Sequence, residues 1–162
     1  MKNAGWRQSR DESPELDAVD LQIIGELTTD GRVSLAELGR RVNLSTPAVA
    51  ERVRRLEQAS VIIGYRAQID PRAFGYHLTA IVRINPAAGQ LRRIAELAIE
   101  LPQISECQRI TGEDCFYLKL HLRSIDELPP LLDQFLLYGQ TTTSIINDSP
   151  VPPRNPPPPA AV

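Results

Sequence analysis

Aromatic residues are scarce in this chain: phenylalanine, tryptophan and tyrosine together make up 5% of its 162 residues. Only two cysteines occur, Cys107 and Cys115, and they form neither a CxxC pair nor a zinc-ligand spacing. The sequence therefore predicts no disulfide framework, no metal site and no cofactor, and it favours reduced thiols in a cytoplasmic protein.

Long apolar runs are also absent. No run reaches the ~20 residues that a membrane-spanning helix needs. The first fifteen residues contain no hydrophobic segment of the kind that directs secretion. We therefore expect a soluble, intracellular protein.

The formal net charge of −2 argues against a histone-like protein that binds DNA with its whole surface. With 42% apolar residues, the chain can form one ordinary core or two small ones.

The stretch SLAELGRRVNLSTPAVAERVRRLE, residues 34–57, predicts two short helices joined by a tight turn. Ser34 and Glu37 have the spacing of a capping box at the start of the first helix. Asn43 suits the turn, because asparagine tolerates a left-handed backbone. Ser45 or Thr46 then caps the second helix. Together these features are typical of a helix-turn-helix whose second helix enters the major groove of DNA.

An ordinary helical hairpin with a solvated basic face would show the same apolar pattern, and the local charge favours the DNA-binding interpretation over it. Residues 32–66 contain seven arginines, three glutamates and no lysine, a local charge of +4 in an acidic chain. Arginine is also the better partner for phosphate and for guanine edges. We therefore predict DNA contacts at Ser45, Thr46, Ala48, Arg52, Arg54, Arg55 and Arg66.

The segments on either side complete a predicted winged helix-turn-helix. An apolar stripe from Leu16 to Thr29, with Asp17 as its N-cap, predicts a first helix that closes a three-helix core. After the second helix of the motif, β-branched residues at 61–63 favour extended structure, and we expect a short wing or hairpin there.

From residue 77 onward the hydrophobic period becomes two, and strands and helices follow in the order β-α-β-β-α-β. This order predicts a ferredoxin-like antiparallel sheet with both helices on one face, and so an α+β protein. The opposite face is too apolar for simple solvent exposure, and we expect it to mediate self-association. Its residues would be Thr79, Ile81, Arg83, Tyr117 and His121.

The chain resembles the leucine-responsive/asparagine-regulator (Lrp/AsnC) family of prokaryotic transcription regulators. The residues that carry the resemblance are LDAVDLQIIGEL, DGRVSLAELGRRVNLSTPAVAERVRRLE, IIGYRAQIDP and TGEDCFYL, in that order. Three features depart from the family pattern: Asn43 replaces a common glycine, Cys115 replaces a frequent aromatic, and a Pro-rich tail replaces a short end.

The resemblance implies a DNA-binding domain joined by a short β hinge to a ligand-sensing domain that dimerises and often forms octamers. The expected segments are a disordered tail (1–15), the winged helix-turn-helix (16–64), a hinge strand and linker (65–76), the ferredoxin-like effector-binding and oligomerisation domain (77–147) and the Pro-rich tail (148–162). The expected DNA sites are imperfect palindromes, because a two-fold dimer presents two recognition helices.

The loop Thr111-Gly112-Glu113-Asp114 is the predicted effector site. Gly112 lets a ligand approach the backbone closely, exposed amides can hold a carboxylate, and Asp114 can accept from an ammonium group. Those features suit a free amino acid, although an ordinary hairpin turn would also use glycine and aspartate. The resemblance places the family's pocket at this loop, completed by a neighbouring dimer. Thr142 and Ser144 are the added candidates on the last strand.

Two other functions compete with this one. An architectural DNA-binding protein would have the same helices and no effector. A haem-precursor decarboxylase, as some relatives of the family are, would need a positioned acid, and His77 and His121 are the only histidines. We predict no catalytic residue and a chain that is not an enzyme.

Overall fold

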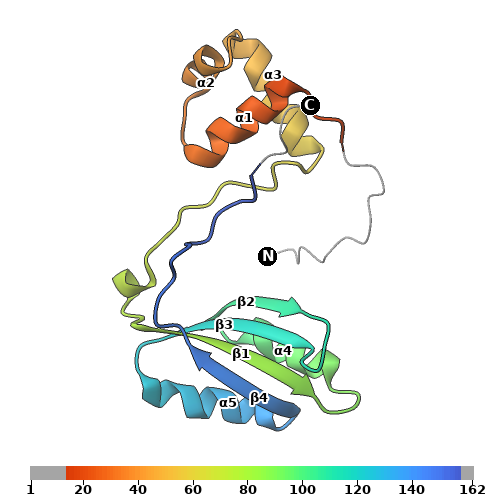
Figure 1. The fold of residues 1–162 in the computed structure, drawn as a ribbon, viewed down its shortest axis with the longest axis vertical. Coiled ribbons are helices and arrows are strands. Elements are labelled where there is room, and N and C mark those ends of the chain that lie inside the picture. The colour runs from red at the N-terminus through yellow and green to blue at the C-terminus, as the bar shows by residue number, and fades with distance from the viewer. Residues whose placement is uncertain (1–13, 158–162) are drawn as a thin grey trace. The chain divides into compact units, whose positions relative to one another are not determined.

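The computed structural model describes residues 14–157, which form two compact units (Figure 1). The first unit contains residues 14–67 together with 153–157, and the second contains residues 68–152. Most of the predicted N-terminal tail and the last five residues of the Pro-rich tail lie outside the described residues. Residues 146–157 contain neither helix nor strand, as expected for a segment dense in proline.

The first unit is the three-helix bundle that the apolar pattern predicts. Its helices are α1 (Ala18–Thr29), α2 (Leu35–Arg41) and α3 (Thr46–Gln58). The fully buried side chains of its core come from all three helices, and they include Ile23, Leu38, Val49 and Leu56. The periodicity of these residues places one apolar stripe of each helix against the other two.

Side-chain caps fix where these helices begin. At α1, the Asp17 carboxylate accepts from the Asp20 amide at 2.8 Å, and the Asp20 carboxylate accepts from the Asp17 amide at 3.3 Å. This reciprocal pair is a capping box. At α2 the expected box is only half formed: Ser34 accepts from the Glu37 amide, but the Glu37 carboxylate pairs with Arg40 and Arg41 instead. Two nearby guanidinium groups attract that carboxylate more strongly than one amide does.

The turn between α2 and α3 has the backbone that the sequence predicts. Asn43 adopts φ 56°, in the left-handed region, and Ser45 caps α3 by accepting from the Ala48 amide. The Leu44 amide donates to the Gly39 carbonyl at 2.8 Å. A Cβ at Gly39 would lie only 2.7 Å from the Leu44 carbonyl oxygen, so the close approach of α2 to the turn requires glycine at this position.

We therefore expect Gly39→Ala to destabilise the first unit by about 1–3 kcal/mol, the usual range for inserting a group into a packed core. The backbone carbonyl of Leu44 can move away only by distorting the turn. Thermal unfolding followed by circular dichroism measures this loss. Gly25→Ala is the matched control, because no atom lies within 4 Å of a Cβ there. Equal melting temperatures for the two variants would contradict the close approach.

The wing predicted after α3 is wrong, because residues 59–70 form no strand. The hinge strand expected within residues 65–76 has no pairing partner in this single chain and stays a prediction. Ser60 takes φ 57°, and the amides of Val61 and Ile62 both donate to the Leu56 carbonyl, at 2.9 and 3.2 Å. Val61 and Ile62 also pack against the three-helix core. These β-branched residues thus complete the C-terminal cap of α3, an arrangement that satisfies a helix carbonyl and buries apolar surface.

The second unit has the predicted ferredoxin-like topology. Its elements are a short 3-10 helix η1 (Pro71–Phe74), β1 (Leu78–Pro86), α4 (Leu91–Glu100), β2 (Ile104–Arg109), β3 (Phe116–Leu122), a 3-10 turn η2 (Ile125–Glu127), α5 (Leu128–Leu136) and β4 (Gly139–Ile145). The sheet order is β2-β3-β1-β4, with every neighbouring pair antiparallel. Figure 1 shows α4 and α5 on the same face of this sheet.

Strict alternation along the strands separates the two faces of the sheet. Val82, Ile84, Phe116 and Leu118 point into the core, where the apolar stripes of α4 and α5 cover them. Thr79 pairs with His121, and Arg83 with Tyr117, on the helix-free face. That face therefore has the composition that the sequence predicts. β4 begins at Gly139, where a Cβ would collide with the Asn85 backbone.

Candidate DNA-binding and effector sites

The exposed face of α3 is the surface that the helix-turn-helix prediction concerns. Val49, Val53 and Leu56 turn one side of α3 into the core. The predicted contacts Ser45, Thr46, Ala48 and Arg54 are all exposed, and they lie near the start of the helix or on its solvent side. Arg54 pairs with Glu51 on the same face, its Nε donating at 2.8 Å. Arg66 lies beyond α3 in the segment without strands and is also exposed.

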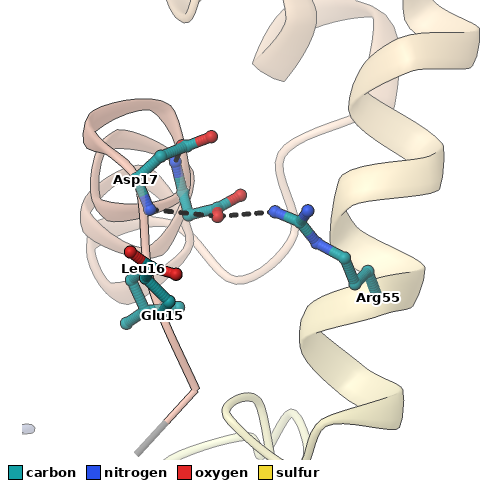
Figure 2. Close-up of a pocket in the computed structure, with 5 residues that line it drawn as sticks. Glu15, Leu16, Asp17 and Arg55 are labelled. Carbon is teal, nitrogen blue, oxygen red and sulfur yellow. Dashed lines mark hydrogen bonds and ion pairs between the residues drawn. The ribbon is translucent and has the colours of Figure 1, made fainter.

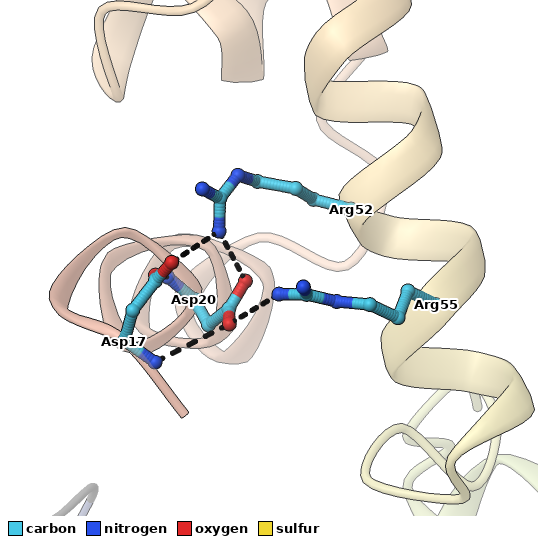
Figure 3. Close-up of polar contacts among 4 residues, drawn as sticks. All are labelled: Asp17, Asp20, Arg52 and Arg55. Carbon is cyan, nitrogen blue, oxygen red and sulfur yellow. Dashed lines mark hydrogen bonds and ion pairs between the residues drawn. The ribbon is translucent and has the colours of Figure 1, made fainter. Parts of the chain in front are cut away.

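Arg52 and Arg55 have a role that the sequence analysis missed. Figure 3 shows both guanidinium groups reaching from α3 to the aspartates at the start of α1. Arg52 Nη1 donates to Asp17 Oδ2 at 2.7 Å and to Asp20 Oδ1 at 2.8 Å. Arg55 Nη2 donates to Asp20 Oδ2 at 2.6 Å. The two arginines therefore tie the recognition helix to α1.

Asp20 lies at the centre of this network. Its side chain is 1% exposed, and it is the only charged residue that is buried among the described residues. A buried carboxylate is costly unless it is paired and hydrogen-bonded, and Asp20 satisfies both of its oxygens through Arg52, Arg55 and the Asp17 amide. The hydrogen bond from Arg52, followed by that from the Asp20 amide, lowers the pKa of Asp17.

A shallow pocket of about 290 Å³ opens beside this network (Figure 2). Glu15, Leu16, Asp17, Asp20 and Arg55 line it. Three carboxylates against one guanidinium disfavour an anionic ligand there. The pocket exposes one side of Arg55, whose side chain is 56% accessible while it contacts Asp20.

Internal ion pairs cancel most of the basic charge that the sequence shows. Residues 14–67 of the first unit contain eight acidic residues and seven arginines. Five of those arginines pair with carboxylates, and Arg40 and Arg41 do so through Glu37. The positive electrostatic potential around this unit is therefore weaker than the local charge of +4 suggests, because acidic residues at the start of α1 lie close to α3 in the fold.

The predicted effector loop leaves the sheet between β2 and β3. Gly112 has φ 118°, a backbone that side chains rarely adopt, and Thr111, Gly112 and Glu113 are exposed. The loop is anchored at its base, where the Ile110 amide donates to the Cys115 carbonyl at 3.0 Å. Such a turn leaves several amides open to a ligand.

Arg83 brings the separate parts of the predicted effector site together. Its Nη1 lies 3.3 Å from Asp114 Oδ2, and in the sheet Arg83 sits opposite Thr142 of β4. Ser144 lies two residues further along β4, opposite Ile81. Sequence analysis placed Arg83 on the helix-free face but not in the effector set. The signal was its strand register, which places Arg83 opposite Tyr117 at the start of β3, where the loop rejoins the sheet.

His121 lies on the helix-free face and uses both ring nitrogens. Nδ1 is 3.0 Å from the Thr79 hydroxyl, and Nε2 is 3.1 Å from the Ser105 hydroxyl. Because Ser105 donates its only hydroxyl hydrogen to the Lys119 carbonyl, its oxygen must accept from Nε2–H. The Thr79 hydroxyl can donate to Nδ1, so these contacts accommodate a neutral imidazole. Burial and, to a lesser extent, Lys119 lower the pKa of His121.

A lowered pKa in the folded state means that protonation favours unfolding. The stabilisation is present above the unfolded pKa of about 6.5 and is lost as pH falls through the folded value. We expect His121→Asn to reduce the drop in melting temperature between pH 7.5 and pH 5, measured by differential scanning fluorimetry. His77→Asn is the control because His77 is exposed. The same drop in wild type and His121→Asn would refute this assignment.

Residues 14–157 offer no group of three or more histidine, cysteine or carboxylate side chains placed to hold a metal ion. Nor does any of their helices combine the length and apolar character that crossing a membrane requires. His77 is exposed in this part of the chain, and His121 is engaged by two hydroxyl groups.

Comparison with known proteins covers both units. Residues 16–57 match the AsnC-type helix-turn-helix domain, and residues 79–156 match the Lrp/AsnC ligand binding domain. The HTH-type transcriptional regulator LrpC of Bacillus subtilis is 36% identical over 132 residues, which are 82% of this chain and 92% of that protein. The leucine-responsive regulatory protein of Rhizobium meliloti is 39% identical over 108 residues, which are 65% of this chain and 69% of that protein.

Solved structures agree with the sequence matches. The structure of B. subtilis LrpC superposes with a TM-score of 0.79 over 83% of this chain and 96% of that one. A feast or famine regulatory protein from M. tuberculosis, complexed with L-methionine, is 34% identical and superposes with a TM-score of 0.81, over 89% of this chain and 100% of that one. With matches in both units and over most of the chain, this protein belongs to the Lrp/AsnC family of transcriptional regulators.

Proposed function

We propose that this chain regulates transcription by placing α3 in the major groove of specific DNA sites and by changing its assembly or DNA affinity when an amino acid binds. The exposed face of α3 carries the proposal: Ser45, Thr46, Ala48 and Arg54 point away from the core, on a helix that two arginines fix to α1. A helix fixed in this way presents the same side chains at every site, as sequence reading requires.

The near-neutral charge of residues 14–67 supports specific binding over general attraction to DNA. Non-specific affinity comes almost entirely from cations that replace counterions at phosphates. Since five arginines here already have carboxylate partners, residues 14–67 offer few free cations to phosphates. Arg54 has the partner most easily exchanged, because the Glu51 side chain is 63% exposed. Arg52 and Arg55 contact DNA in this proposal while they remain held by Asp20.

The effector part of the proposal rests on opposite charges beside an open loop. Asp114 suits an ammonium group, and Arg83 together with the amides around Gly112 suits a carboxylate. Thr142 and Ser144 add hydroxyl groups, and Thr111 and Glu113 complete the rim. The M. tuberculosis relative complexed with L-methionine shows that the same fold accepts an amino acid. We propose a free α-amino acid as the effector class.

For assembly, we propose a two-fold dimer formed through the helix-free face of the sheet, with octamers built from dimers. Half-buried Ile81 and Tyr117 lie on that face without covering helices. A two-fold dimer presents two copies of α3 to one side of a duplex, so its sites should be imperfect palindromes with half-sites one or more helical turns apart, ~10 base pairs each.

Light scattering on the full-length protein at micromolar concentration should give at least twice the chain mass of 18.0 kDa. Ile81→Glu should shift the mass toward one chain, because it places a charge in the proposed interface. Ile99→Glu on α4 is the matched control, since Ile99 is 69% exposed on the helical side. A wild-type monomer, or an Ile81→Glu variant that stays dimeric, would argue against this interface.

The proposal as a whole is tested by selecting duplexes from a random-sequence library with the full-length protein. Enrichment of one motif containing inverted half-sites is the expected result. Recovery of unrelated sequences in proportion to the input would fit an architectural DNA-binding protein without sequence preference, and would refute the regulator proposal.

A further inference from the structure

We infer that Asp20 is a positioning residue for DNA recognition, which holds Arg52 and Arg55 in one geometry and cancels their charge toward non-specific DNA. This inference rests on the proposed DNA-binding role of α3. It starts from the burial of Asp20, whose side chain is 1% exposed and accepts three hydrogen bonds, from Arg52, from Arg55 and from the Asp17 amide. Among the described residues, Arg52 and Arg55 are the cations that pair with this buried carboxylate.

The geometry leaves part of the Arg55 guanidinium group available for a contact with DNA. Only Nη2 contacts Asp20, and within residues 14–157 the Nε–H and Nη1–H groups make no hydrogen bond. The side chain is 56% exposed, whereas that of Arg52 is 28% exposed and shares Nη1 between two aspartates. A phosphate or base edge can therefore approach Arg55 on its open side while Asp20 fixes the other side (Figure 3).

The neutral charge of this cluster affects how well the protein distinguishes specific from non-specific DNA. Asp17, Asp20, Arg52 and Arg55 together carry no net charge, so at a distance they attract a phosphate backbone weakly. At a site where the backbone or a base meets Arg55 in the held orientation, the short-range hydrogen bond still forms. Asp20 therefore lowers non-specific binding without lowering specific binding.

Asp20→Asn tests this directly, since it keeps the side-chain volume and removes the charge. The variant is compared with wild type on two duplexes of equal length: the one that wild type selects from a random library, and its scrambled version. One additional phosphate contact steepens the plot of log affinity against log salt by about 0.9, equivalent to about fivefold in affinity at 0.15 M salt. We expect that change on the scrambled duplex alone, so that discrimination falls about fivefold.

Two further variants separate positioning from folding. Asp20→Asn combined with Arg55→Gln should return the salt slope on the scrambled duplex to the wild-type value, because the released cation is gone. Glu15→Gln makes the same change in net charge near the start of α1, at an exposed residue without an ion pair among the described residues, and should leave the slope unchanged. Circular dichroism establishes that each variant is folded.

The outcomes are distinct. If Asp20 only stabilises the fold, Asp20→Asn lowers the active fraction, reduces binding to both duplexes equally and leaves the salt slope unchanged. That result overturns the inference. The inference is also overturned if Arg55→Gln alone reduces the salt slope on the scrambled duplex by about 0.9, because Arg55 would then already act as a free cation toward non-specific DNA. If wild type does not prefer its selected duplex, the proposed function itself fails instead.

Discussion

Replacing Arg54 by glutamate is expected to weaken binding to the selected duplex by roughly a hundredfold or more. Loss of one good base contact costs about 1–3 kcal/mol, and a dimer loses it twice. The new carboxylate also faces phosphate and lies beside Glu51 on the same side of α3. Fluorescence anisotropy with a labelled duplex measures this effect.

Arg92→Glu is the matched control for that experiment. Arg92 is 91% exposed on α4 and pairs with a glutamate one turn away, as Arg54 pairs with its own glutamate neighbour. The substitution makes the same change in net charge in the second unit. The assignment of α3 as the DNA-reading helix is untenable if Arg54→Glu and Arg92→Glu bind the duplex equally well.

Asp114→Ala is expected to abolish the effector response. Hydrogen bonds to charged groups contribute about 1.5–3 kcal/mol, so loss of the ammonium contact weakens the effector by roughly ten- to hundredfold. A thermal-shift screen of the twenty amino acids identifies the responsive ligand with wild type, because a ligand that prefers the native state raises its melting temperature. The variant should show no shift at the same ligand concentration.

DNA binding without effector and dimer formation should both survive in Asp114→Ala, since the ion pair that Asp114 makes among the described residues is with Arg83. Asp133→Ala on the exposed side of α5 is the control and should respond as wild type does. An Asp114→Ala protein that still responds fully would place the pocket elsewhere.

The fold was predictable because both units are built on clear hydrophobic periods. Leu38, Val49 and Leu56 follow the helical period, and the residues from Phe116 to Leu122 alternate strictly. Local chemistry predicted the turn as well, because asparagine accepts the left-handed backbone that Asn43 adopts. The prediction of a wing was wrong although it also rested on local chemistry. Val61 and Ile62 have strand propensity, but in the fold their amides cap α3 and their side chains pack against the three-helix core.

The site was predictable only in part, because its decisive contacts join residues distant in sequence. Asp20 and Arg55 are 35 positions apart, and no spacing rule marks them as partners. A charge count over residues 32–66 omitted Asp17 and Asp20, which neutralise arginines of α3 in the fold. Likewise, Arg83 reaches Asp114 through strand register, a tertiary property that a single strand does not show.

The most direct test of the account is one anisotropy titration of the full-length protein at 0.15 M salt. The selected duplex and its scrambled version are each titrated with and without the amino acid that the thermal-shift screen identifies. The account predicts affinity for the selected duplex at least ~10³-fold above that for the scrambled one, as specific DNA-binding proteins show, and a change in the selected-duplex affinity when the amino acid is present. Equal affinities for the two duplexes, unaffected by the amino acid, would contradict it.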